Sequence, residues 1–263
     1  MSEIQAPPQP ISLGYWPRAG FWRRAAAFVI DALLIAVPFQ ILVAVVYPLT
    51  NGAIQVSSGI VINSCGPVNI TKLPTDLPLP PPVGANYALV CRTSLFGWET
   101  ARWLAVGRVT KEGIVTKKIE HKYRMGPDNK LRNAYAVDWI VMLAMFIYLV
   151  TFEHRAGVTV GKRQLGLQVV DANDPDRGGV PLRNAVARNL FMWIGVVPAL
   201  VVLVGAFLSK GADADAIFTN TFFFWFSVAV LFGLMIVAWM VVDMARKRDP
   251  LYDAMARTAV IRV

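Results

Sequence analysis

The sequence predicts an all-α membrane helix bundle of four transmembrane helices, with a small, disulfide-clipped, extracytoplasmic β-rich insertion between the first two. Of its 263 residues, 56% are hydrophobic and only 16% are charged, which is too apolar for a core and a water-exposed surface together. The apolar residues gather into four long runs, and about 20 residues of helix cross a hydrocarbon core of about 30 Å. Both cysteines of the chain lie in the loop after the first run.

The four runs define the expected order of segments. Each run must be helical, because hydrocarbon offers no partner for a free backbone N–H or C=O group. Small residues four positions apart, Gly195 with Ala199 and Ala229 with Gly233, predict close approach of helices. The predicted segments are a cytoplasmic N-terminal segment (1–24), the first span (25–47), the outer loop (48–133), the second span (134–152), a cytoplasmic interfacial loop (153–188), the third span (189–208), a short outer loop (209–218), the fourth span (219–243) and a cytoplasmic tail (244–263).

Basic residues indicate which side of the membrane each loop occupies, because they are enriched in short cytoplasmic loops. Arginines precede the first span, and basic residues are frequent in residues 153–188 and 244–263. The short loop before the fourth span instead carries Asp213 and Asp215. The long outer loop is also basic, but the rule weakens for loops of more than about 60 residues. Four crossings therefore place both termini in the cytoplasm.

The outer loop contains Cys65 and Cys91, the only cysteines of the chain. An even pair within one extramembrane segment is typical of an oxidising compartment. A disulfide between them would stabilise the loop by about 3 kcal/mol. The alternative is two unpaired thiols.

The same loop has the pattern of a small β module. A proline-rich spacer, residues 73–82, precedes two predicted strands over 87–92 and 101–110, and residues 114–123 alternate as the return strand of a hairpin. Trp98 and Trp103 have two alternative roles. They dock on lipid headgroups or helices, or they fill the core of the module.

Asp31 lies inside the first apolar run, where a carboxylate costs about 2.5–3.5 kcal/mol. Arg24 precedes it by seven residues, which is two helical turns. Both side chains therefore project from one face of the helix, separated by about 10 Å along its axis. Asp31 should be paired, protonated or facing water, and Arg24 is its nearest source of compensation.

The arrangement of these two residues resembles the pattern of the RDD family of bacterial integral membrane proteins. This family is named for one arginine and two aspartates. Arg24 and Asp31 match the arginine and the first aspartate, and Asp253 in the tail is the natural second aspartate. The stretch GVTVGKRQLG is similar to the family's G-x-T-x-G-K-x-x-x-G, and an R-N pair follows before the third span. The matching residues of these two motifs are Gly157, Thr159, Gly161, Lys162, Gly166 and Arg188. The resemblance does not cover the outer loop.

The resemblance implies a location in the bacterial plasma (inner) membrane, and transport roles, including cation/proton exchange, for some members. One hypothesis is transport of a small ion or solute, in which Asp31 takes up a cation or proton and Arg24 biases its pKa. The other is a non-catalytic scaffold or accessory subunit of a larger membrane complex, in which Arg24, Asp31 and Asp253 form a structural network. The expected partners are the lipid bilayer and either a second copy of the chain or a larger membrane complex.

Other functions have weaker support. The stretch GVTVGKR has one residue too few between its glycines to be a phosphate-binding loop. Arg163 also occupies the position at which such a loop has its metal-binding Ser or Thr. His121 and His154 fall on opposite sides of the membrane, so no metal site is expected. We also find no nucleophile–base pair, catalytic residue or cofactor loop, which argues against an enzyme. Nucleic acid is not needed to explain the basic residues, because the topology places them.

The cytoplasmic loop after the second span begins with Glu153 and His154, which we interpret as a solvated helix end. Residues 164–171 then alternate between apolar and polar, and a turn-rich stretch leads to residues 180–182. This pattern predicts a short hairpin on the membrane face. The basic residues around it are expected to contact anionic lipid headgroups.

Overall fold

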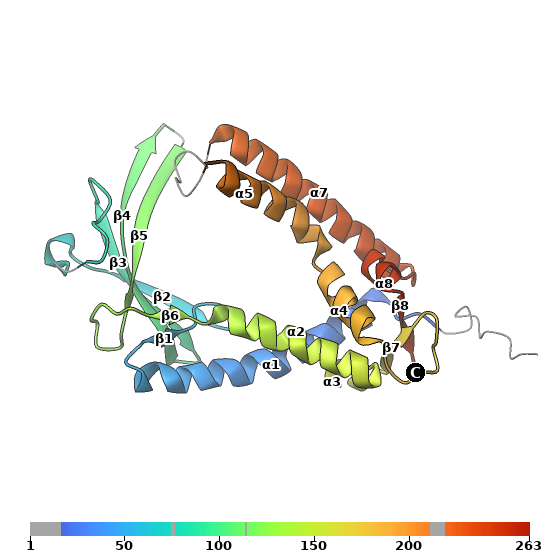
Figure 1. Cartoon of the computed structure of the whole chain (residues 1–263). Coiled ribbons are helices and arrows are strands. Elements are labelled where there is room, and N and C mark those ends of the chain that lie inside the picture. The colour runs from blue at the N-terminus through green and yellow to red at the C-terminus, as the bar shows by residue number, and fades with distance from the viewer. Residues whose placement is uncertain (1–16, 75–76, 114, 211–218) are drawn as a thin grey trace, which may run out of the picture. The chain divides into compact units, whose positions relative to one another are not determined.

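The computed structural model describes residues 17–74, 77–113, 115–210 and 219–263 (Figure 1). The fold is mixed α/β, with 48% helix and 24% strand in several antiparallel sheets. The predicted all-α bundle of four transmembrane helices is therefore wrong. Residues 1–16 of the predicted N-terminal segment, and residues 211–218 with Asp213 and Asp215, lie outside the described residues. The chain divides into unit 1, residues 1–31 with 146–263, and unit 2, residues 32–145.

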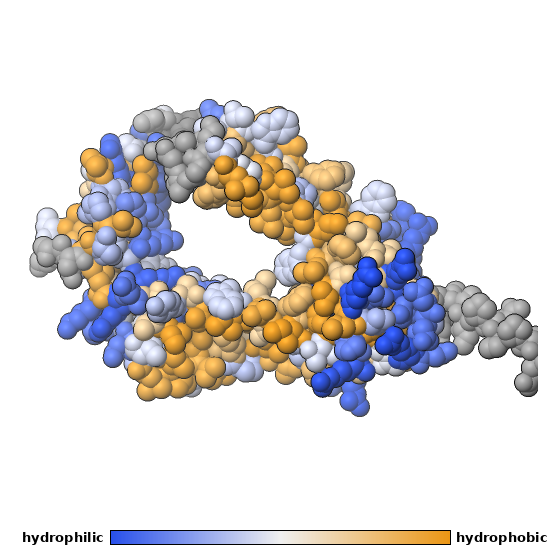
Figure 2. Space-filling model, viewed as in Figure 1, coloured by the Kyte–Doolittle hydropathy of each residue, from blue (hydrophilic) through white to orange (hydrophobic). Residues whose placement is uncertain are grey.

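Three described helices are long and apolar enough to cross a membrane: α1 (Phe21–Leu49), α2 (Asp138–Ala156) and α7 (Asn220–Ala245). Only 22% of the apolar window of α1, and 17% of those of α2 and α7, is buried. Hydrophobic residues therefore dominate the surfaces of these helices, which are orange in Figure 2. Lipid is the solvent that such surfaces require.

The predicted third span is broken into α4 (Leu182–Phe191), η3 (Ile194–Val196) and α5 (Val197–Lys210). The axes of α4 and of the helix that follows it differ by 41°. The two helices are long enough to cross a membrane only if they are taken together as one bent span. Asn189, the expected start of the span, instead lies within α4 and is buried. At the break, a Cβ atom on Gly233 of α7 would lie 2.1 Å from the carbonyl oxygen of Gly195. Gly195 and Gly233, each from a different predicted small-residue pair, thus allow η3 to contact α7.

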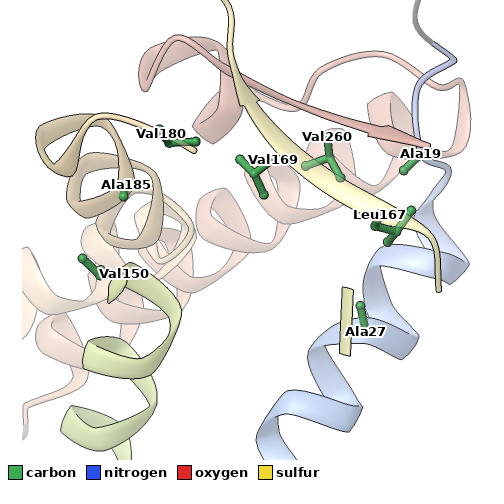
Figure 3. Close-up of a cluster of buried hydrophobic side chains, with 8 residues drawn as sticks. All are labelled: Ala19, Ala27, Val150, Leu167, Val169, Val180, Ala185 and Val260. Carbon is green, nitrogen blue, oxygen red and sulfur yellow. The ribbon is translucent and has the colours of Figure 1, made fainter. Parts of the chain in front are cut away.

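Unit 1 contains a two-stranded antiparallel sheet of β7 (Leu167–Asp171) and β8 (Thr258–Arg262). The predicted hairpin within the cytoplasmic loop is therefore wrong, because the partner of β7 comes from the tail, after α8 (Leu251–Met255). Residues before α1 join the sheet, since Ala19 N donates to Val260 O at 3.0 Å. Figure 3 shows the small core around this sheet, which contains Ala19, Ala27, Val150, Leu167, Val169, Val180, Ala185 and Val260.

Unit 2 contains an antiparallel sheet in the order β2-β3-β4-β5 and a short parallel pair, β1-β6. The predicted disulfide is confirmed: Cys65 of β2 and Cys91 of β3 are register partners joined by a bond. The strand pairing covers the predicted ranges except residue 114, which lies outside the described residues, and each of the three strands extends beyond its predicted end. The bounds are β1 Ile54–Gln55, β2 Ile62–Pro67, η2 Ile70–Lys72, β3 Tyr87–Leu95, β4 Trp98–Glu112, β5 Val115–Met125 and β6 Tyr135–Ala136.

Candidate functional site

Asp31 is fully buried in unit 1 and is held by neutral donors. Its carboxylate accepts hydrogen bonds from Thr159 Oγ1 at 2.5 Å, Tyr148 OH at 2.8 Å and Gly161 N at 2.8 Å. Thr159 also caps α3 (Val160–Gln164), which fixes its hydroxyl in place. Hydrogen bonds of this kind compensate a buried carboxylate. The family motif thus supplies two of the three groups that satisfy Asp31.

Among the contacts of the described residues, Arg24 has none with Asp31. The prediction that Arg24 compensates Asp31 directly is therefore wrong. Its Nη1 donates to Asp253 Oδ2 at 2.5 Å, and its Nε donates to Ala19 O at 3.0 Å. The Arg24 side chain is 8% exposed, and the Asp253 side chain is fully buried. The arginine and the second aspartate of the resemblance are therefore ion-paired, while the first aspartate has separate partners.

The ion pair continues into a larger charge cluster, which we define as Arg24, Asp253, Arg188, Glu153 and Lys162. Arg188 Nε donates to Asp253 Oδ1 at 2.7 Å, and its Nη1 donates to Glu153 Oε1 at 2.5 Å. Lys162 Nζ donates to the same Glu153 oxygen. Positive and negative groups therefore alternate along the cluster, so each buried charge has an opposite neighbour.

Glu153 is the centre of this cluster and is fully buried, so its interpretation as a solvated helix end is wrong. Besides the two basic groups, Asn189 Nδ2 donates to its second oxygen at 3.0 Å. Lys162, expected to face lipid headgroups, is also buried. Burial lowers the pKa of Lys162, because the ammonium form loses its hydration, and the neighbouring Glu153 carboxylate opposes that shift.

A cavity of about 240 Å³ adjoins the charge cluster within unit 1. Four members of the cluster, all except Asp253, line it together with Asp31. The rest of the lining is largely apolar and includes Val237, Met240 and Met244 of α7. Among the described residues, Arg24 Nη2 is buried and has no hydrogen-bond acceptor. A buried donor without an acceptor is costly, which makes it a natural partner for a ligand oxygen.

The glycines of the family motif have structural roles. Gly157 and Gly166 have φ angles of +68° and +62°, which glycine adopts at little cost. A Cβ atom on Gly161 would lie 2.2 Å from Ala27 O, so this residue lets α3 approach α1. The motif therefore positions Thr159 and Lys162, the two side chains that reach Asp31 and Glu153.

The sequence interpretation missed Tyr148, Glu153 and Asn189. Glu153 carried a usable signal, because an acid at the end of an apolar run has a high cost unless it is paired. Asn189 belongs to the R-N pair of the family resemblance, which was a second signal, whereas Tyr148 had none. By contrast, Cys65 and Cys91 belong to unit 2 and take no part in the charge cluster.

Comparison with known proteins gives one match. No curated protein and no solved structure is similar enough to match the chain. The RDD family profile matches residues 103–257, which is 155 of the 263 residues. The match includes Glu153, Lys162, Arg188 and Asp253. With the apolar helices, it identifies a membrane protein. The chain belongs to the RDD family.

Proposed function

We propose that this protein is a multi-pass transporter of the bacterial plasma membrane, which takes a small ion or solute into the cavity beside the charge cluster. The observation that carries the proposal is the cavity itself, which is lined by both buried charges and apolar side chains. Charged groups in membrane-embedded regions are costly and commonly mark the pathway of an ion or solute. A pocket with a few convergent polar groups is also the usual form of a small-molecule site.

The free hydrogen-bonding capacity of the cavity favours one class of ligand. Both oxygens of Asp31 already accept hydrogen bonds, so Asp31 offers a cation little that is not in use. Arg24 Nη2 instead lacks an acceptor among the described residues. The ligand is therefore expected to present an anionic or carbonyl oxygen rather than to be a bare metal cation.

The orientation that we propose places both described ends of the chain in the cytoplasm. Residues 17–19 are hydrogen-bonded to β8, so these two segments lie on the same side. Arg23 lies in the first turn of α1, and the Arg246–Arg248 stretch follows α7, as the enrichment of basic residues in the cytoplasm predicts. The Cys65–Cys91 disulfide is in turn typical of an oxidising, extracytoplasmic compartment.

Met240→Trp is expected to abolish transport without disturbing the charge cluster. Met240 lines the cavity and is 5% exposed, so a larger ring at this position narrows the cavity. The measurement is the transient current of proteoliposomes on a solid-supported membrane after jumps of sodium acetate, sodium phosphate or sodium chloride. The matched control is Leu234→Trp, which adds the same ring to a position that is 59% exposed on the same helix.

The wild type and Leu234→Trp should give equal currents with acetate or phosphate, and Met240→Trp should give the background current. A folded Met240→Trp protein with full current would rule out the cavity as the route. No current from the wild type with any of the three salts would count against transport.

The second candidate function is a non-catalytic scaffold or accessory subunit, and the full hydrogen bonding of Asp31 favours it. Asp31→Asn places an NH2 group among three donors, which is expected to cost about 1–3 kcal/mol. Tyr148→Phe, which removes one donor only, should cost less. Fluorescence-detected size-exclusion chromatography after heating ranks both variants. Loss of the folded protein or of a co-purifying complex supports a scaffold, whereas folded Asp31→Asn protein without current supports transport.

A further inference from the structure

The turn between β3 and β4 in unit 2 presents two aromatic rings to the exterior. Phe96 and Gly97, its two central residues, have φ angles of +47° and +92°. Such turns normally contain Asn, Asp or Gly, because a bulky residue at positive φ is strained. Phe96 is nevertheless 84% exposed, and Trp98 beside it is 59% exposed. Neither the turn geometry nor the core of the sheet explains these rings.

Two isoleucines extend the apolar surface at the same end of the sheet. Ile62 begins β2, is 66% exposed and is one register pair from the turn, opposite Ser94. Ile60, just before it, is 43% exposed. We refer to Ile60, Ile62, Phe96 and Trp98 as the hairpin-tip patch. An exposed group of large apolar side chains of this kind marks a binding surface.

The chain that leads to the patch is fixed to the helices of unit 2. Ser58 O accepts a hydrogen bond from Gln40 Nε2 of α1 at 3.1 Å, and Ser58 Oγ donates to Asp138 Oδ1 of α2 at 2.6 Å. Thr100, two residues after Trp98, exchanges hydrogen bonds with Val56 at 3.1 and 2.9 Å. The chain segment that leads to the hairpin tip is therefore held at Gln40 of α1.

The position of Gln40 along α1 indicates the depth of this chain segment. Sixteen residues separate it from Arg24, which is about 24 Å of helix. The hydrocarbon core is about 30 Å thick. Gln40 lies within the candidate span of α1 and nearer to its C-terminal end, so a membrane-crossing α1 places it in the hydrocarbon region. Tyr135 and Trp139, at the start of α2, are 75% and 62% exposed, as aromatic residues at a membrane interface commonly are.

We propose that the hairpin-tip patch inserts into the lipid of the extracytoplasmic leaflet and anchors the sheet to it. The chain beside the patch is hydrogen-bonded to α1 and α2, whose exposed surfaces are apolar, so the patch is placed toward lipid rather than the water phase. Phe96 and Trp98 are suited to this position, because their rings bury a large apolar area. The strained turn allows the sheet to present both rings at its tip.

Site-directed spin labelling of the full chain tests the anchor. Phe96→Cys and, independently, Ile62→Cys each provide a free thiol, since Cys65 and Cys91 are joined in a disulfide. The control is Val83→Cys, which is 90% exposed in the loop before β3. Each labelled protein is reconstituted in phosphatidylethanolamine–phosphatidylglycerol vesicles. Collision of the nitroxide with oxygen, which concentrates in lipid, is compared with collision with a water-soluble nickel chelate.

Labels at positions 96 and 62 should collide more often with oxygen than with nickel, and the label at position 83 should show the reverse. The proposal is overturned if the nickel chelate reaches positions 96 and 62 as readily as position 83. It is also overturned if both positions are protected from both reagents, because that result indicates a protein partner or a second copy on the patch. The second labelling site keeps the test decisive if one variant does not fold.

Discussion

Replacement of Glu153 by alanine is expected to lower the free energy of unfolding by about 3–5 kcal/mol, because removal of one partner leaves buried charges without compensation. The change removes the acceptor of both Lys162 and Arg188, which are themselves buried. Glu153→Gln keeps an acceptor oxygen without the charge, so it should be less damaging. Unfolding in mixed micelles with increasing dodecyl sulfate measures both effects.

Asp249→Asn is the control for Glu153→Ala. Asp249 pairs with Arg18 at 2.9 Å, but the two side chains are 26% and 19% exposed. A partly exposed pair contributes about 1 kcal/mol or less. Equal loss of stability in Asp249→Asn and Glu153→Ala would show that the charge cluster does not act as a buried network.

Gly161→Ala is expected to have a comparably large effect, through close packing rather than charge. The added methyl group would lie 2.2 Å from Ala27 O and 3.0 Å from Asp31 Cγ, so α3 must move away from α1. Overpacking costs about 1–3 kcal/mol. The movement also breaks the hydrogen bond from Gly161 N to Asp31, and a poorly satisfied buried acceptor costs about 1–3 kcal/mol more.

The same unfolding measurement applies to Gly161→Ala, with Gly205→Ala as its control. Gly205 lies in α5, and a Cβ atom there meets nothing within 4 Å. Because alanine favours helix more than glycine does, Gly205→Ala should be neutral or slightly stabilising. A Gly161→Ala protein as stable as the wild type would show that the approach of α3 to α1 is not tight.

The membrane class and the disulfide could be predicted from the sequence because both depend on local composition. An apolar run of about 20 residues has one stable conformation in lipid, which is the helix. Each of two cysteines in one loop has only the other as its partner. The break between α4 and α5 could not be predicted in this way. Hydropathy measures the length of a run, whereas the bend falls near Gly195, whose backbone closely approaches Gly233 of the distant α7.

The candidate site was predicted in part. Arg24, Asp253, Lys162 and Arg188 stood out as charges in the family pattern, and the structure brings them together. The scaffold hypothesis included Arg24 and Asp253 in one network, but the sequence did not show that Arg24 reaches this aspartate in the tail rather than the one two turns away on its own helix. β7 likewise pairs with β8, which is far from it in the chain. Contacts between such distant segments leave no periodic signal in one sequence.

The position of Asp253 and β8 after every apolar helix also determines when the fold can be completed. A ribosome makes this segment after α7, so Arg24 and Arg188 enter the bilayer region before their shared carboxylate exists. A polypeptide that stops at α7 would leave Arg24 without its carboxylate partner, Arg188 with Glu153 alone, and β7 without its partner strand. Cellular proteases could therefore distinguish an abortive translation product from a finished copy by the absence of this one closing segment.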